Sequence, residues 1–486
     1  MLKLRDPGLL REQAYLGGAW VDADSGATVE VRDPANGERL ASVPVCGAAE
    51  TRRAIAAAEQ AQRGWAETPA KERAAILRRL NDLMLANQDD LALIMTREQG
   101  KPLAEAKGEI AYAASFIEWF ADEARRVYGD TIPATQRDRR ILALKQPIGV
   151  TAAITPWNFP TAMLTRKVGP ALAAGCSMVV KPATQTPLSA LAFAELAHRA
   201  GLPQGLLSVL TGASAAIGGE MTSNPTVRKL SFTGSTEVGR LLMRQSADTV
   251  KKLSLELGGN APFIVFDDAD LDAAVEGAIV SKYRNTGQTC VCANRLYVQR
   301  GVLAAFADKL VSKVQGLKVG PGTEPGVTQG PLIDDKAVAK VEQHVADALA
   351  KGGKVLTGGR RHPLGGRFYE PTVIVGANSE MLVAHEETFG PLAPIFAFDT
   401  EDEAIRLANA TEFGLAAYFY TASLGRAMRV AERLESGMVG VNTGLISTAE
   451  APFGGVKQSG LGREGSKYGI DEYLEVKYVC LAGLDR

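Results

Sequence analysis

One cysteine of this chain stands in a setting that suits chemistry. Cys290 closes the run Asn285-Thr-Gly-Gln-Thr-Cys290, and Cys292 follows two residues later. A cysteine attacks as its thiolate, and a free thiol with a pKa of about 8.5 is mostly protonated at neutral pH. A nucleophilic Cys290 therefore needs an activating group from elsewhere in the fold. The alternative is a buried structural thiol, because free cysteine is among the most buried residue types.

Two other residues could assist such a thiol. Glu256 follows the strand-like run 252–255, and burial at a strand end raises the pKa of a carboxyl group toward that of a general base. Asn158 follows the apolar run 148–154, and its amide could donate to an oxyanion, a contact commonly worth about 3 kcal/mol. The alternatives are an exposed loop glutamate and a turn asparagine that binds its own backbone.

Two more strand ends could hold an anionic ligand. Lys181 ends the run 177–180, at the side of a parallel sheet where ligands bind. Gly234 and Ser235 follow the run 229–232 and open a helix, whose first N–H groups suit a phosphate. Residues 460–465 match the dinucleotide motif G-x-G-x-x-G, but they do not follow an apolar strand, so we interpret the match as chance. Any nicotinamide cofactor must bind by a variant geometry.

The order of predicted elements indicates an α/β fold that positions these residues. Alternating strands and helices predict a parallel sheet with helices on both faces. We expect strands at 148–154, 177–180, 206–210, 229–232 and 252–255, and helices near 161–174, 187–200, 213–222 and 236–247. A second alternation from 262 to about 445 predicts a second sheet. Residues 48–127 indicate three or four amphipathic helices. We expect two further strands, at 141–145 and 472–479, to pair with another segment or subunit, since an isolated strand needs a sheet.

Composition limits the classes of function. The chain has 486 residues, enough for two or three domains. Its net charge is 54 − 55 = −1, which gives no field for nucleic acid or an anionic membrane surface. No apolar run is long enough to span a bilayer. Five sparse cysteines favour a reducing compartment, and we expect a cytoplasmic protein. The four histidines form no metal-spaced cluster with cysteine, so we expect no metal site.

Seven segments, taken together and in order, resemble the aldehyde dehydrogenase superfamily. They are Thr155–Pro160, Lys181–Ala183, Phe232–Ser235, Glu256–Gly259, Gly287–Cys290, Glu387–Pro391 and Pro452–Gly460. The Cys290-Val-Cys292 run and the segment 465–473 are similar to the NADP-type succinate-semialdehyde dehydrogenase branch. The resemblance implies two Rossmann-like parallel-sheet domains and a small β oligomerisation arm. Residues 1–125 and 145–257 would bind NAD(P), 258–450 would form the catalytic domain, and 126–144 with 466–486 would form the arm.

The resemblance also implies roles for single residues. Cys290 would attack the aldehyde, Asn158 and the Cys290 N–H would stabilise the oxyanion, and Glu256 would activate water to hydrolyse the thioester, with no metal. Glu387 would hold the nicotinamide ribose, with Phe389 beside the ring. The complete set of implied cofactor-binding residues is Thr155, Pro156, Trp157, Lys181, Pro182, Ala183, Thr184, Gly234, Ser235, Leu257, Glu387 and Phe389.

Thr184 bears on the choice of cofactor. NAD-preferring relatives carry a glutamate here, which binds the adenosine ribose and repels a 2′-phosphate. Threonine does not repel the phosphate and can donate a hydrogen bond to it, with Lys181 nearby. We predict that NADP is preferred, with NAD as an alternative. A threonine that merely starts a helix would make the position uninformative.

Three residues bear on the choice of substrate. Arg166 lies about two helical turns beyond Asn158, and Arg284 lies six residues before Cys290. Two guanidinium groups suit a carboxylate at the far end of a short aldehyde, and Ser447 would add a hydroxyl. The branch resemblance predicts succinate semialdehyde, with glutarate semialdehyde as the alternative because pockets discriminate single methylenes weakly. Either arginine could instead be a salt-bridge residue.

Three further expectations complete the sequence-based account. Cys292 is a candidate redox partner of Cys290, although it could be a small packing residue. The arm strands suggest a homodimer or a homotetramer built as a dimer of dimers. Different classes of function are a cysteine acyltransferase or hydrolase without nicotinamide, and a non-catalytic scaffold. The strand-end segments at Lys181 and Gly234 argue against the former, and an intact Cys290 argues against the latter.

Overall fold

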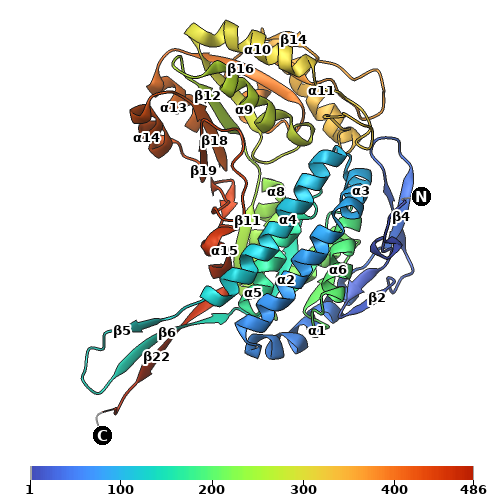
Figure 1. Ribbon diagram of the computed structural model, residues 1–486, viewed down its shortest axis with the longest axis vertical. Coiled ribbons are helices and arrows are strands. Elements are labelled where there is room, and N and C mark those ends of the chain that lie inside the picture. The colour runs from blue at the N-terminus through green and yellow to red at the C-terminus, as the bar shows by residue number, and fades with distance from the viewer. Residues whose placement is uncertain (1–2, 485–486) are drawn as a thin grey trace.

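The computed structural model describes residues 3–484 as two α/β bodies and a projecting β arm (Figure 1). The outermost residues of the predicted first-domain and arm ranges, 1–2 and 485–486, lie outside the described residues. The lower body in Figure 1 holds the first sheet and the upper body holds the second, while the arm extends from the lower body. The predicted α/β fold class is confirmed.

The first sheet has eight strands. In spatial order they are β2 (Ala19–Val21), β1 (Ala14–Leu16), β9 (Leu207–Val209), β8 (Ser177–Lys181), β7 (Val150–Ile154), β10 (Val227–Thr233), β11 (Lys252–Glu256) and β21 (Gly460–Leu461). The five strands from β9 to β11 run parallel. The edge strands pair antiparallel, which the predicted all-parallel sheet did not include. The carboxyl ends of the parallel strands therefore meet at one edge.

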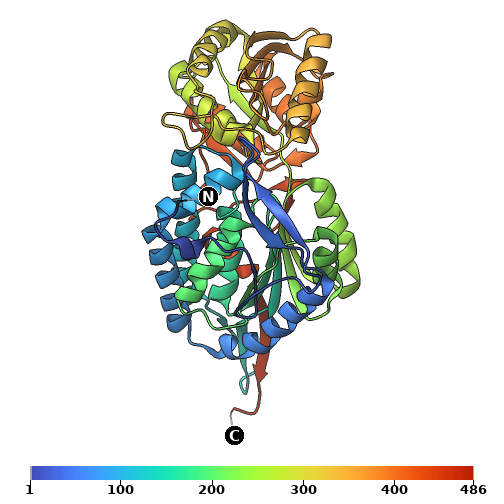
Figure 2. The same cartoon turned by 90° about the vertical axis from the view of Figure 1, so that its right-hand side faces the viewer.

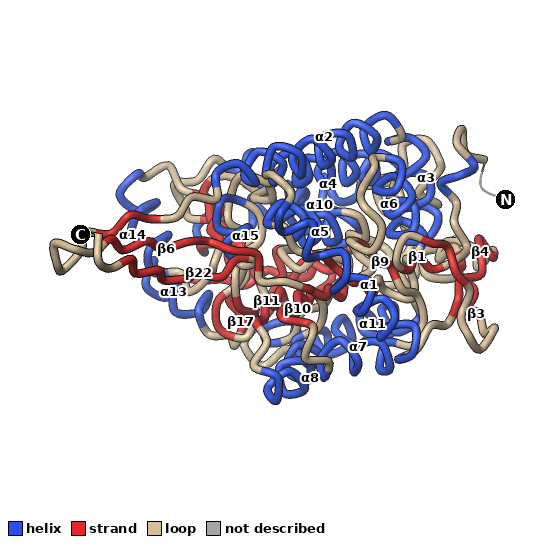
Figure 3. Tube along the Cα trace, turned by 90° about the horizontal axis from the view of Figure 1, so that it is seen from below, coloured by secondary structure: helices blue, strands red, loops and turns tan. Residues whose placement is uncertain are grey.

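Helices cover both faces of this sheet, as the alternation of strands and helices predicts. Val179 of β8 packs in one buried cluster and Val180 in another, because successive strand residues point to opposite faces. Viewed from below, the strands lie between layers of helices (Figure 3). The helices of this body are α1 (Ala48–Glu67), α2 (Ala70–Ala86), α3 (Gln88–Gln99), α4 (Leu103–Glu123), α5 (Ala162–Ala174), α6 (Leu188–Arg199), α7 (Ser214–Ser223) and α8 (Thr236–Ser246).

The second sheet has seven strands, and six of them are parallel. In spatial order they are β14 (Lys354–Thr357), β15 (Thr372–Ala377), β16 (Leu392–Phe398), β13 (Ala293–Gln299), β12 (Ala261–Val265), β18 (Ala416–Tyr420) and β19 (Met438–Val441). Its helices are α9 (Leu271–Tyr283), α10 (Leu303–Gln315), α11 (Asp335–Ala350), α12 (Leu382–His385), α13 (Glu401–Asn409) and α14 (Leu424–Arg433). Figure 2 shows this body stacked end to end on the first.

The arm is a three-stranded antiparallel sheet. Its strands are β5 (Asp130–Ile132), β6 (Arg140–Pro147) and the C-terminal β22 (Leu474–Leu481), with β6 in the centre. The predicted strands 141–145 and 472–479 thus pair with each other. The helix α15 (Ser466–Asp471) leads into the arm. Two further strand pairs are the hairpin of β3 (Thr28–Arg32) with β4 (Arg39–Pro44), and the antiparallel pair of β17 (Phe413–Gly414) with β20 (Val456–Lys457). None of the helices within residues 3–484 is long and apolar enough to cross a membrane.

Candidate active site

A cavity of about 260 Å³ opens where the two bodies meet. Its walls come from the ends of β7, β10 and β11 in the first body, and from the nucleophile loop before β13 and the segment after α12 in the second. The lining contains nine residues predicted from sequence: Pro156, Trp157, Asn158, Gly234, Ser235, Leu257, Cys290, Glu387 and Phe389. Thr233, Gly258 and Lys340 complete it. Segments more than 200 residues apart in sequence therefore share one cavity.

Cys290 sits at the end of a backbone held in an unusual conformation. Asn285 and Thr286 have φ of 51° and 56°, and Gly287 has φ of 77°. Such left-handed residues persist only where the surroundings fix them. A side chain at Gly287 would clash with the carbonyl oxygen of Gly390. The loop is thus locked before it delivers Cys290 to the cavity.

The Cys290 thiol is not activated by its static surroundings alone. Burial raises its pKa to about 12, and the positive charge of Arg166 opposes that rise only in part. The thiol is therefore protonated at neutral pH, and its reaction requires a group that removes the proton.

Glu256 is the carboxyl group placed to take up protons. Only 2% of the residue is exposed, and neither carboxyl oxygen has a hydrogen-bond partner within residues 3–484. Burial raises its pKa well above 4.5, and the negative charge of Glu464 raises it further, against Arg166 and Lys167. A Cβ on Gly454 would lie 2.9 Å from Glu256 Oε1, so glycine there leaves room for the carboxylate.

Asn158 links the loop after β7 to the loop before β13. Its Nδ2 donates to the backbone oxygen of Gln288 at 3.0 Å, and the residue is 5% exposed. A side-chain amide has two N–H groups, so one remains to donate to an oxyanion in the cavity.

Arg166 is completely buried but only half paired. Its Nε donates to Glu464 at 2.6 Å, and its guanidinium lies 3.9 Å from the ring centroid of Phe453. Neither Nη1 nor Nη2 has a hydrogen-bond partner within the described residues. Burial alone would raise the pKa of Glu464, but the positive charges of Lys167 and Arg166 outweigh it and hold that pKa at about 2. Glu464 is therefore a permanent carboxylate, and two guanidinium nitrogens stay unused.

The second predicted arginine lies in the same neighbourhood. Arg284 follows α9, and its guanidinium lies 5.0 Å from the ring centroid of Phe159. The hydroxyl of Tyr112 is buried beside Arg166. Burial raises the Tyr112 pKa, and the charge and hydrogen bonding of Arg166 and the charge of Arg284 oppose the rise. The positive charges of both arginines also lower the pKa of Cys290, against the larger effect of burial.

Ser447 is not tied to this cluster by any contact. It lies half-buried in the loop between β19 and β20 and forms no hydrogen bond within the described part of the chain. Its predicted substrate role stays a prediction.

The cofactor side of the cavity combines aromatic rings and a carboxyl group. The rings of Trp157 and Phe389 meet edge to face with centroids 5.5 Å apart. Gly259 N donates to Glu387 Oε1 at 3.3 Å, and burial raises the Glu387 pKa to about 7. Ser235 caps α8 by accepting from Val238 N at 3.4 Å, so the first N–H groups of α8 adjoin the cavity.

Lys181 and Thr184 lie outside this cavity, at the last residue of β8 and three residues beyond it. Lys181 Nζ donates to Thr184 Oγ1 at 3.4 Å, and burial lowers the Lys181 pKa to about 8. Thr184 does not start a helix, because α6 begins at Leu188 and the Glu98 carboxylate accepts its first N–H groups. A separate cavity of about 500 Å³ is lined by Thr184, Gln185 and Ser214 on one side and Arg367 on the other. Pro182 and Ala183 connect the two residues, and Thr155 N donates to Lys181 O at 3.1 Å.

Cys292 faces away from the cavity. Its thiol donates to the backbone oxygens of Ser281 and Lys282 at 3.0 and 3.1 Å, and all five cysteines are free. A bond to Cys290 would require this thiol to leave the end of α9.

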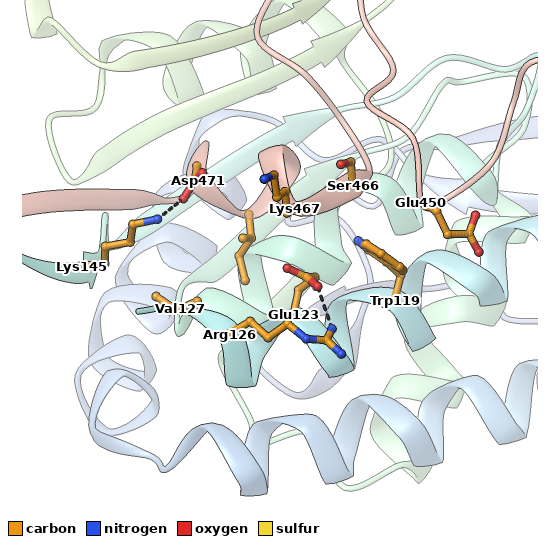
Figure 4. Close-up of a pocket in the computed structure, with 10 residues that line it drawn as sticks. Trp119, Glu123, Arg126, Val127, Lys145, Glu450, Ser466, Lys467 and Asp471 are labelled. Carbon is orange, nitrogen blue, oxygen red and sulfur yellow. Dashed lines mark hydrogen bonds and ion pairs between the residues drawn. The ribbon is translucent and has the colours of Figure 1, made fainter. Parts of the chain in front are cut away.

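A third cavity, of about 420 Å³, lies away from the chemistry between the end of α4, α15 and the arm (Figure 4). Four of its charged side chains form two ion pairs, Lys145 with Asp471 and Arg126 with Glu123. It contains none of the predicted site residues. Within residues 3–484 there is no group of three or more side chains suited to hold a metal ion.

Three residues of the site were missed by the sequence analysis. Tyr112 lies in an apolar helix and looks like a core residue. Lys340 lies on the amphipathic α11, and its positive charge acts on Glu387. Glu464 belongs to the run 460–465 that was set aside as a chance motif match. An acidic residue in a glycine-rich run was the one sequence feature that could have marked Glu464 as a site residue.

Comparison with known proteins identifies the class to which this geometry belongs. The aldehyde dehydrogenase family model matches residues 20–479, and the chain belongs to that family. A glutarate-semialdehyde dehydrogenase of Pseudomonas aeruginosa is 68% identical over 99% of this chain and 100% of its own. A succinate-semialdehyde dehydrogenase of Escherichia coli, named for NADP(+), is 65% identical over 99% and 100%. The crystal structure of succinate-semialdehyde dehydrogenase from Burkholderia pseudomallei has a TM-score of 0.98 at 70% identity, covering 99% of both chains. The protein is an NAD(P)-dependent aldehyde dehydrogenase.

Proposed function

We propose that this enzyme oxidises succinate semialdehyde to succinate, preferably with NADP. The observation that carries the proposal is the unfilled polar cluster beside Cys290. Arg166 Nη1 and Nη2 are buried without an acceptor in hydrogen-bonding geometry among the described residues, and the Tyr112 hydroxyl beside Arg166 is buried too. Unpaired buried donors are costly, and a carboxylate accepts charge-assisted hydrogen bonds from several at once. A short aldehyde with a terminal carboxylate would satisfy them and present its carbonyl to Cys290.

The catalytic roles follow from the charges and contacts around that carbonyl. Cys290 Sγ loses its proton to solvent water and attacks the carbonyl carbon, and the oxyanion accepts hydrogen bonds from Asn158 Nδ2 and the Cys290 backbone N–H. A nicotinamide held by Glu387 and Phe389 would supply the acceptor for the hydride of the thiohemiacetal carbon. Glu256 then takes a proton from the water that hydrolyses the thioester, a role that suits a carboxyl group with a raised pKa.

The cavity fits a nicotinamide dinucleotide. Glu387 offers an acceptor to ribose hydroxyls, the pair of Trp157 and Phe389 gives an apolar slot, and α8 directs N–H groups toward a phosphate. The Thr184 hydroxyl and the Lys181 ammonium would contact the adenosine ribose and favour a 2′-phosphate, since no carboxylate stands at position 184. The Escherichia coli relative named for NADP(+) supports this preference.

Glutarate semialdehyde is the second candidate substrate. It is supported by the name of the Pseudomonas aeruginosa relative, and it differs from succinate semialdehyde by one methylene. A hydrophobic pocket discriminates one methylene by only about 10- to 200-fold, so both substrates should be turned over.

We further propose a homodimer or homotetramer in the cytoplasm. The arm exposes apolar side chains, including Tyr128, Val476 and Tyr478, and such a strip suits contact with another subunit. The predicted division into a cofactor domain, a catalytic domain and an arm belongs to the same proposal. Five unpaired cysteines suit a reducing compartment.

The assay that tests the function measures reduced-nicotinamide absorbance with each semialdehyde and each cofactor. We expect the largest kcat/KM with succinate semialdehyde and NADP, and no turnover by Cys290→Ala. A larger kcat/KM with glutarate semialdehyde than with succinate semialdehyde would make glutarate semialdehyde the preferred substrate. No signal with any short aldehyde would leave a cysteine acyltransferase or hydrolase as the better account.

A further inference from the structure

A buried ion pair lies directly beneath the loop that carries Asn158. Lys101, between α3 and α4, contacts Glu109 of α4, and the two side chains are 0% and 1% exposed. Removing both charges from such a pair is often neutral for stability, because desolvation offsets the attraction. Stability alone therefore does not explain why the pair is here.

Within residues 3–484, the other hydrogen bonds of these two side chains go to residues 158–162. Lys101 Nζ donates to the backbone oxygen of Asn158 at 2.8 Å and lies 3.9 Å from the ring centroid of Phe159. Glu109 Oε1 accepts from the backbone N–H groups of Thr161 and Ala162 at 3.0 and 3.2 Å. The pair thus fixes both the start and the end of residues 158–162.

The same helix also holds the loop before Cys290. Glu105, one turn before Glu109 on α4, accepts from Asn285 N at 2.7 Å. Asn285 Nδ2 then donates to Asn158 O at 3.0 Å, the same oxygen that Lys101 contacts. Two carboxylates of α4 therefore bind the two loops, Glu109 the Asn158 loop and Glu105 the loop before Cys290. Asn285 connects the two loops.

We propose that Lys101 and Glu109 are positioning residues that set Asn158 against Cys290. The inference rests on the proposed catalytic roles of Asn158 and Cys290. The pair lines no part of the cavity and acts through the backbone of residues 158–162. Misplacing a catalytic group by about 1 Å can lower a rate by about 100-fold, so a rigid support here matters for kcat.

The variant that tests the proposal is Glu109→Asp. It keeps the charge beside Lys101 but withdraws the carboxylate by about one carbon–carbon bond, ~1.5 Å. We expect kcat with succinate semialdehyde to fall about 10- to 100-fold, with little change in the Kd of NADP. If Glu109→Asp fails to fold, the charge-free double variant Lys101→Met/Glu109→Gln replaces it and has the same expected result.

A double-mutant cycle separates positioning from a general structural effect. In an Asn158→Ala background, Glu109→Asp should cause no further loss of kcat, because the group that it positions is gone. The matched control is Lys229→Met, which removes another fully buried ammonium, bonded to Ser254 and Glu472. It should lower the unfolding temperature and leave kcat unchanged.

The outcomes are distinguishable. An active Cys290→Ala would overturn the proposed function itself. With Cys290→Ala inactive, a wild-type kcat for Glu109→Asp would overturn the positioning role alone. So would a loss of equal size in the Asn158→Ala background.

Discussion

Replacing Arg284 by glutamine tests the charge that we assign to substrate recognition. The Arg284 guanidinium lies 5.0 Å from the ring centroid of Phe159, and its positive charge lowers the pKa of both Tyr112 and Cys290, so this charge acts at the reaction site. A hydrogen bond to a charged group contributes about 1.5–3 kcal/mol, and 1.36 kcal/mol corresponds to a factor of ten in rate. Arg284→Gln should therefore lower kcat/KM for succinate semialdehyde by about 10- to 150-fold.

The assay compares two aldehydes of equal chain length. Butanal lacks the terminal carboxylate, so its kcat/KM should change little in Arg284→Gln. The matched control is Arg300→Gln, because Arg300 is a surface residue paired with Asp399. That variant should leave both substrates unaffected. Equal losses with succinate semialdehyde and butanal in Arg284→Gln would refute the charge-pairing argument.

Three further predictions address the cofactor, the base and the second thiol. Thr184→Glu should repel a 2′-phosphate and raise the ratio of kcat/KM for NAD to that for NADP; an unchanged ratio would contradict this. Glu464→Gln removes a negative charge that raises the Glu256 pKa, so the rising limb of the pH–kcat profile should move to lower pH. A shift of this limb to higher pH would contradict its assignment to Glu256. Oxidant inactivation that dithiothreitol reverses should disappear in Cys292→Ala, while identical behaviour of the two proteins would exclude a switch between Cys290 and Cys292.

The regular elements were accessible from the sequence because their signals are local. The helix expected near 187–200 is α6 at Leu188–Arg199, and the helix expected near 161–174 is α5 at Ala162–Ala174. The antiparallel edge of the first sheet was not predicted, because β21 pairs with β11 across about 200 residues of intervening chain. No local periodicity reports such a pairing.

The site residues likewise fall into two groups, those with a local sequence signal and those defined by long-range contacts. Asn158 and Glu256 stand in distinctive local runs at the ends of β7 and β11, and Cys290 stands in one before β13, so the sequence marks them as candidates. Glu464 gains its meaning only from Arg166, which lies 298 residues away in sequence. Tyr112 likewise matters only because packing brings both arginines to its phenol. Long-range packing sets these charges and pKa values, and a single sequence does not encode them in any short pattern.

The most direct test of the catalytic account is a single-turnover measurement on Glu256→Gln. With succinate semialdehyde and NADP, this variant should release about one equivalent of NADPH per subunit and then stall. Intact-mass and peptide analysis should find a succinyl group on Cys290, because the thioester forms but water is not activated. Steady turnover by Glu256→Gln, or a burst without any adduct on Cys290, would contradict the account.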